Sequence, residues 1–267
     1  MKKITPFIFI LFAGFVISIS SITVYKKNPC FLHETKKKTE LSIEDIVNLD
    51  ILNMQHPQRK TYNRALGFSP KSKTYKRPIR YYIHNKTGSH KFKIVSLPEN
   101  YAYEISSDAI RFIVDTFERI DSYIDVDFER ITTSQRAHIE IYKAKPSKDF
   151  VGLAQDKFWE RPSKYKTEII WSEPDRNYKD INLKKYPNLT YFSANTIVHE
   201  IGHALGLSHA DILGKYQHDG INPYQSDIDT RDTIMSYNLP NCVPPDEDVF
   251  FSDNDLNALR KIWGVEK

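Results

Sequence analysis

The chain has 267 residues, of which 40% are hydrophobic and 13% aromatic, enough to build one large domain with a sizeable core. Its 9 glycines are too few for a collagen-like or low-complexity protein. The net charge is only +4, and the lysines are scattered among glutamates and aspartates rather than gathered in a basic stripe. We therefore expect no nucleic-acid partner.

The N-terminus is typical of an exported protein. Two lysines precede an almost continuous apolar run over 7–17, which extends more weakly to Val24. This order favours a secretory signal peptide in residues 1–24. An uncleaved membrane anchor is the alternative, because the run is nearly long enough to span a bilayer and Lys26 and Lys27 blur the charge asymmetry. Both interpretations place the bulk of the chain outside the cytoplasm, as a secreted (extracellular or periplasmic) protein or as a membrane-anchored one.

Residues 25–75 are rich in lysine and contain one short helical pattern that begins at Ser42. We interpret them as a linker or a pro-segment, followed by a catalytic domain over 76–267. Cys30 and Cys242 are compatible with a disulfide in an oxidising compartment. Two free thiols are the alternative, and the sequence does not choose between them.

The domain alternates between strand and helix patterns, which predicts an α/β layer arrangement. Apolar residues alternate in the expected strands and recur at helical spacing in the expected helices. Ser193 is the expected N-cap of the second helix, and Ser252 with Asp255 forms a capping box for the third, which Gly264 ends. The expected strands cover 79–83, 124–128, 139–141, 151–155 and 168–171, and the expected helices cover 105–120, 194–205 and 252–264.

One stretch of the second helix, His-Glu-Ile-Gly-His-Ala-Leu-Gly-Leu-Ser-His, has the spacing that a catalytic zinc requires. His199 and His203 are four residues apart, so they lie on one helix face and can bind one ion. Gly206 permits a turn that brings His209 back as a third ligand. Three protein ligands leave a fourth position for water, and Glu200 would act as the base beside that water.

Chance alone is a poor explanation of this stretch, because five such fixed positions match on the order of 10⁻⁵ times per chain. The alternative is a buried helix with incidental histidines. In a helical projection, His199, Glu200 and His203 fall largely opposite a narrow apolar stripe, which is not an arrangement for packing alone. The stripe consists of Ala194, Ile197, Val198, Ile201 and Leu205.

The full motif, followed by Thr-Ile-Met-Ser-Tyr at 233–237, resembles the metzincin metallopeptidases, and most closely their serralysin and matrixin branch. The resemblance covers roughly 77–264. It implies a metzincin-like zincin domain with a twisted, mostly parallel sheet, an antiparallel edge strand, an active-site helix and a C-terminal helix. Gly152, Leu153 and Ala154 lie in a stretch similar to the matrixin edge strand, to which an extended substrate would add through main-chain hydrogen bonds.

The resemblance also implies the activity, which is hydrolysis of peptide bonds in protein or peptide substrates by a zinc endopeptidase with Glu200 as general base. Met235 would form a soft floor beneath the metal. The phenol of Tyr237 would approach the zinc and support the oxyanion. Ordinary core packing is the alternative for both residues.

Two further questions stay open at this level. Asp227, Asp229 and Asp232 could contribute to a calcium site, and an ordinary polar loop is the alternative. A zinc-loaded scaffold that binds a protein without cutting it is the alternative function, although a pure binder does not need Glu200. A membrane-tethered sheddase would share the chemistry and differ in its location.

Overall fold

The structure is a computed structural model that describes residues 39–47, 62–63, 65–69, 75–92, 101–146, 151–156, 166–173, 181–209, 228–240 and 248–267. The expected signal peptide or anchor, Cys30, Cys242 and Asp227 lie outside the described residues. Of the helices that are described, none has the length and apolar character needed to cross a membrane.

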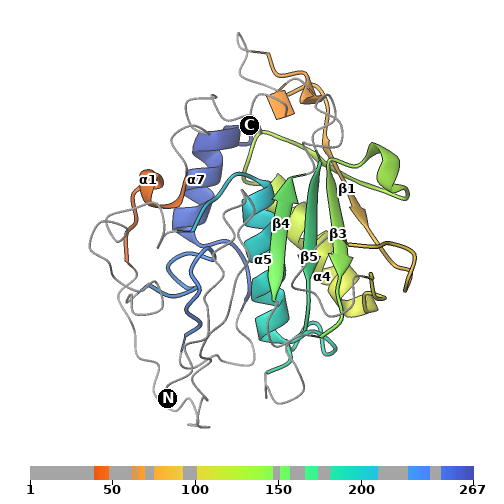
Figure 1. Cartoon of the computed structure of the whole chain (residues 1–267). Coiled ribbons are helices and arrows are strands. Elements are labelled where there is room, and N and C mark those ends of the chain that lie inside the picture. Colours follow the sequence, from red (N-terminus) through yellow and green to blue (C-terminus); the bar gives the residue numbers. More distant parts are fainter. Residues whose placement is uncertain are drawn as a thin grey trace, which may run out of the picture.

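The order of elements confirms the α/β class (Figure 1). A one-turn helix comes first, and strands and long helices then follow in the expected order. The elements are α1 (Ile43–Ile46), β1 (Ile79–Ile83), α4 (Ser107–Asp121), β2 (Phe128–Ile131), the 3-10 turn η1 (Ser134–Arg136), β3 (Ile139–Lys143), β4 (Gly152–Asp156), β5 (Thr167–Trp171), α5 (Tyr191–Ala204) and α7 (Asp253–Trp263).

Four strands of the five-stranded sheet are parallel, and the fifth runs against them. The order across the sheet is β2-β1-β3-β5-β4, and β4 pairs antiparallel with β5, for example Ala154 with Ile169. β5 is buried along its whole length, as expected for an inner strand with both faces covered. The expected mostly parallel sheet with an antiparallel edge strand is confirmed, and β4 forms that edge in the described part of the chain.

The main core lies between one face of the sheet and the long helices. α5 packs on β4 and β5, and α4 packs on α5 and β2, so the edge strand and the motif-bearing helix lie side by side (Figure 1). A second, smaller cluster lies on the opposite face of the sheet. Its members are Phe92, Ala102, Tyr142, Ala144, Leu153 and Ile170.

Two local expectations are wrong. The N-cap of α5 is Thr190, whose hydroxyl accepts the backbone N–H of Ser193 at 3.1 Å, because the buried Tyr191 already belongs to the helix and extends its apolar face upstream. The strand expected over 124–128 begins only at Phe128. Ile124 instead packs in the core and makes an isolated bridge to Val265, so the alternation there reflects a buried connection.

The end of the chain follows its sequence pattern. Ser252 and Asp255 form the expected capping box of α7, and Gly264 ends the helix with a φ of 96°, a conformation that favours glycine. The described parts of 25–75 also contribute to the main core through Ile46, Val47, Tyr62 and Leu66. The interpretation of 25–75 as a linker or pro-segment stays a prediction about processing.

Candidate metal centre

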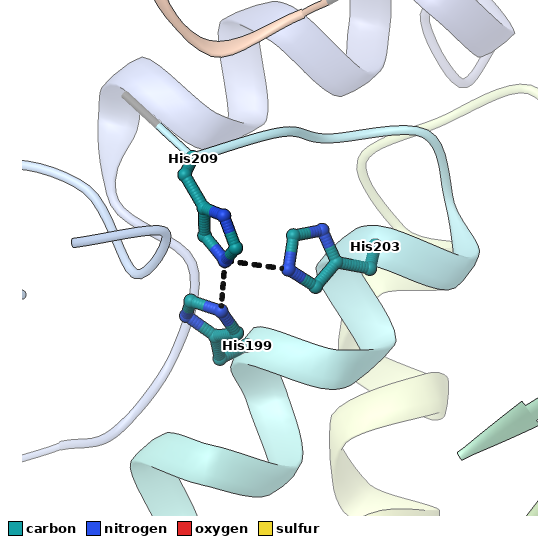
Figure 2. A group of neighbouring side chains, drawn as sticks. All are labelled: His199, His203 and His209. Atoms are coloured by element: carbon teal, nitrogen blue, oxygen red, sulfur yellow. Dashed lines mark hydrogen bonds between the residues drawn. The ribbon is translucent and has the colours of Figure 1, made fainter. Parts of the chain in front are cut away.

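The end of α5 and the turn after it bring three histidines together (Figure 2). Leu207 donates its N–H to the carbonyl of Gly202 at 2.9 Å, and Gly206 donates to the carbonyl of His203 at 3.0 Å. This pair of bonds is the Schellman helix ending, which requires the positive φ of 102° that Gly206 adopts. The chain therefore reverses and directs His209 back toward the helix.

The three imidazoles point their Nε2 atoms at one another (Figure 2). Nε2 of His209 lies 3.0 Å from Nε2 of His199 and 2.9 Å from Nε2 of His203. Among the described residues, one group of three or more histidine, cysteine or acidic side chains lies close enough together to hold a metal ion, and these three histidines form it. The structure thus brings together the three residues that the motif predicted as ligands.

The second nitrogen of each helical histidine fixes its tautomer. Nδ1 of His199 lies 2.8 Å from the carbonyl oxygen of Ile234, and Nδ1 of His203 lies 2.9 Å from that of Leu207. A carbonyl only accepts, so both Nδ1 atoms carry the hydrogen and both Nε2 atoms present a lone pair. At most one hydrogen, on His209, can then lie among three converging nitrogens. Such a cluster fits a cation far better than it fits a network of hydrogen bonds.

Burial keeps the imidazoles in the neutral form that binds metals. It lowers the pKa of His199 to about 3, with a further contribution from His203 and an opposing one from the Ile234 carbonyl. It lowers the pKa of His203 to about 4 against the Leu207 carbonyl. The pKa of His209 is also held well below its usual value by burial and by the two neighbouring histidines.

Glu200 lies between α5 and the edge strand. Only 1% of the residue is exposed, and burial raises its pKa to about 8, although the backbone N–H of Ala154 opposes that rise. Its Oε2 atom has no hydrogen-bond partner among the described residues. A buried carboxyl oxygen without a partner is costly, so this atom is a candidate to bind a further group.

Gly152 permits this close approach of β4 to α5. A Cβ atom at this position would collide with Oε1 of Glu200 and lie 2.7 Å from Cγ2 of Thr196. Ala154 follows on the same face of the strand, whereas Leu153 belongs to the cluster on the opposite face. The three residues expected as a substrate strand therefore divide between the two faces of the sheet.

The turn that contains Met235 and Tyr237 lies against the histidines. Met235 is fully buried, and a Cβ atom at Gly202 would lie 2.7 Å from its sulfur, so the sulfur packs on α5 at Gly202. The hydroxyl of Tyr237 lies 2.9 Å from Nδ1 of His209, on the side of that ring away from the cluster. The structure thus places Tyr237 at the site as a partner of the third histidine.

Asp255 connects this turn to α7, and the sequence showed only its capping role. One carboxylate oxygen, Oδ2, accepts the backbone N–H of Ile234 at 2.8 Å and that of Ser252 at 2.9 Å. The carbonyl of the same Ile234 accepts Nδ1–H of His199. No sequence signal could show this link, because the capping box already accounts for the carboxylate.

The acidic residues that were candidates for calcium bind protein donors. Asp229 accepts the guanidinium of Arg231, with an Nη2 to Oδ2 distance of 2.6 Å. Asp232 accepts the backbone N–H of Asp229 at 3.1 Å on Oδ2 and that of Thr39 at 2.8 Å on Oδ1. In the described residues these carboxylates thus stabilise the turn, and a calcium role stays a prediction.

Comparison with known proteins adds little to this picture. No family model matches the chain, and no curated protein matches it. A solved structure described as the "GM1 bound form of the ECX AB5 holotoxin" is similar over 85% of this chain and 91% of that chain, with 15% sequence identity and a TM-score of 0.44. A likeness at this TM-score carries no argument about fold or function.

Proposed function

We propose that this chain is an exported, zinc-dependent endopeptidase of the metzincin type, which hydrolyses peptide bonds in protein or peptide substrates. One observation carries the proposal. Three neutral imidazoles converge through their Nε2 atoms, and the next residue after His199 is a buried glutamate whose Oε2 atom has no hydrogen-bond partner among the described residues. Structural networks pair their polar groups, whereas these imidazole lone pairs and this carboxyl oxygen are not balanced by donors in the described part of the chain.

Zinc is the metal that suits these donors best. Imidazole nitrogens favour zinc, copper, iron or nickel over the hard cations magnesium and calcium, which take oxygen ligands. Three histidines with an open fourth position are the ligand set of catalytic zinc. When bound at His199, His203 and His209, zinc would lower the pKa of a water molecule to about 7 and polarise a carbonyl group.

Glu200 supplies the proton transfer in this proposal. Its Oε2 atom has no hydrogen-bond partner among the described residues, so in its ionised form it can accept a proton from the attacking water and return that proton to the leaving amine. The Ala154 N–H donates to the carboxylate, and the lack of a side chain at Gly152 leaves room for that carboxylate between strand and helix. Glu200 is thus held in a defined position rather than left mobile in solvent.

The edge strand β4 is the proposed binding site for substrate. It pairs with β5 on one side, and an extended peptide can add to an open strand edge through main-chain hydrogen bonds. Leu153 points into the cluster behind the sheet, so its side chain packs the strand and its main chain would contact the peptide. Tyr237 is proposed to act through His209, whose ring it contacts, and an oxyanion role remains the alternative.

A pair of glutamate variants tests the proposed mechanism. Glu200→Gln should retain zinc and lose casein cleavage by about 100-fold or more, because general-base catalysis contributes 10²–10⁴-fold. Glu168→Gln is the matched control, since Glu168 is also 1% exposed but lies on the opposite face of the sheet. Bound zinc would be measured by atomic absorption and cleavage by release of fluorescent peptides, with and without a chelator.

The outcomes separate the rival functions. A Glu200→Gln variant that cleaves as well as the parent would disprove the mechanism. A parent chain that binds zinc and captures a protein without cutting it would support the non-cleaving scaffold instead. Mass analysis of the mature N-terminus distinguishes a secreted enzyme from a membrane-tethered sheddase, because only the latter retains residues 1–24.

A further inference from the structure

We infer that residues 39–47 support the metal centre and remain on the working protein, because they hold the turn that presents His209. The inference rests on the proposed function only in that the three histidines bind a metal. It limits any removable pro-segment to the residues before Thr39.

The first contact is made directly beside the third histidine. The carbonyl of Ile46 accepts the backbone N–H of Ser208 at 2.8 Å, and Val47 pairs with Leu207 in an antiparallel bridge. The carbonyl of Leu207 also accepts Nδ1–H of His203. The two residues that lead into His209 are thus held by the 39–47 segment on one side and by a second histidine on the other.

The second contact reaches the loop that leads to Met235. The backbone N–H of Thr39 donates to Oδ1 of Asp232 at 2.8 Å. Asn254 of α7 joins the same segment, because its Nδ2 donates to the carbonyl of Thr39 at 2.8 Å and to that of Asp232 at 2.9 Å, and its Oδ1 accepts the N–H of Leu41 at 3.3 Å. The segment therefore connects both loops that contact the histidines.

Between these contacts the segment is packed as part of the domain. Ile46 and Val47 are each 1% exposed and belong to the main core. Asp45 stabilises the start of the short helix α1, because its carboxylate accepts the backbone N–H of Ser42 at 2.9 Å. Loss of the segment would uncover core residues and leave the N–H of Ser208 without its acceptor. A linker or a loosely attached pro-segment would not require such contacts.

Two double substitutions separate support of the metal from general stability. Ile46→Ala with Val47→Ala removes two core side chains at the bridge to Leu207. Ile124→Ala with Val126→Ala is the matched control in the full-length chain, because these residues are 0% and 2% exposed and Ile124 makes the bridge to Val265. Both pairs delete an isoleucine and a valine, so both should lower the melting temperature to a similar degree.

Only the first pair of substitutions should weaken the binding of zinc. We expect its zinc dissociation constant, measured by competition with a chromophoric chelator, to rise about tenfold or more, as for other substitutions that disturb the support of metal ligands. The control should stay within about threefold of the parent, since it lies away from the ligands. Hydrogen exchange at the Ser208 amide should accelerate in the first pair alone. Equal changes in zinc affinity in the two pairs would overturn the inference.

A milder pair decides the question if the double variant does not fold. Asn254→Ala removes the side-chain contacts to the segment, whereas Asn257→Ala, on the same helix, removes only an exposed contact to Arg260. Faster exchange at Ser208 and weaker zinc binding in Asn254→Ala alone would support the inference, and identical behaviour of both would overturn it.

Failure of this inference differs from failure of the proposed function. Unchanged zinc binding in a chain that cleaves casein would overturn the inference alone. Segment-dependent zinc binding in a chain that cleaves nothing would overturn the endopeptidase alone. A chain that binds no zinc would overturn both.

Discussion

Histidines and glutamates gather on both faces of the sheet, and the two groups differ in how their polar atoms are balanced. Behind the sheet, Nε2 of His90 lies 2.8 Å from Oε1 of Glu168, whose other oxygen accepts Nε2–H of Gln155 at 2.6 Å. Lys166 lies 2.5 Å from Glu140 in the same region. On α5, by contrast, His199 and His203 both direct a lone pair at a third imidazole.

The difference shows how a buried polar cluster can be assigned a role. Donors and acceptors behind the sheet complement one another, so that group can stabilise the fold without an added ligand. On α5 the lone pairs of His199 and His203 meet a third imidazole that carries at most one hydrogen between them, so that group suits a cation better than a closed network of hydrogen bonds. Residue type alone would not separate the two groups, because both contain histidine and glutamate.

The largest expected effect removes one member of each group. His209→Ala should weaken zinc binding about a thousandfold, since structural zinc sites are worth about 10–16 kcal/mol shared among their ligands. His90→Ala should leave zinc affinity unchanged and lower the free energy of unfolding by about 1–3 kcal/mol, because it leaves Glu168 with one partner fewer. Chelator competition and urea unfolding measure the two quantities. An equal loss of zinc affinity in both variants would contradict the proposed difference between the two groups.

Acid should weaken the sheet through His138, which lies at the start of β3. Its Nδ1 accepts the N–H of Arg80 at 2.9 Å, and burial, helped by the charges of Arg80 and Lys166, lowers its pKa from 6.5 to about 4. The unfolded chain therefore binds a proton below pH 6.5 that the folded chain binds only near pH 4. The contribution of His138 to the free energy of unfolding is therefore complete above pH 6.5, and it declines by about 3 kcal/mol as the pH falls to 4.

The variant His138→Gln tests this pH dependence. It retains a side-chain acceptor but cannot be protonated, so its free energy of unfolding should decline less than that of the parent between pH 6.5 and 4. Urea titrations at several pH values provide the comparison, and the other histidines contribute equally to both proteins. Parallel pH profiles of the two would show that His138 is not responsible.

The smallest expected effect concerns Gly152, where the edge strand meets the glutamate. In Gly152→Ala the new methyl group would displace Glu200, so the turnover number should fall about thirtyfold, near 2 kcal/mol, with zinc content unchanged. Gly88→Ala controls for lost stability, because its φ of 74° disfavours a side chain although the new Cβ atom would meet nothing within 4 Å, so it should lower the melting temperature without changing turnover. A Gly152→Ala enzyme with normal turnover would show that Glu200 does not depend on this close approach.

Local patterns in the sequence predicted the elements well, whereas contacts between distant segments were not predictable. The capping box at Ser252, the helix end at Gly264 and the three histidines follow from short-range spacing, and the structure reproduces them. The N-cap at Thr190 was missed because the apolar pattern was counted from Ala194.

Other features depend on tertiary structure. The collision at Gly152 requires the packing of β4 on α5, and the contacts of Ile46 with Ser208 join residues far apart in the chain. Neither has a periodic signature, so the sequence predicts a linker or a pro-segment over 25–75 and does not show that Ile46, Val47, Tyr62 and Leu66 belong to the core.

Asp255 both caps α7 and holds the turn beside the histidines, which bears on the biosynthesis of the protein. This residue of α7 holds Ile234, and Ile234 holds His199, so a helix made after the three histidines completes the alignment of the first of them. Domains fold as units while the N-terminal part is synthesised first. A nascent chain that has not yet extended through α7 therefore lacks the carboxylate that holds Ile234, and the alignment of His199 is completed only when the polypeptide has been extended past this helix.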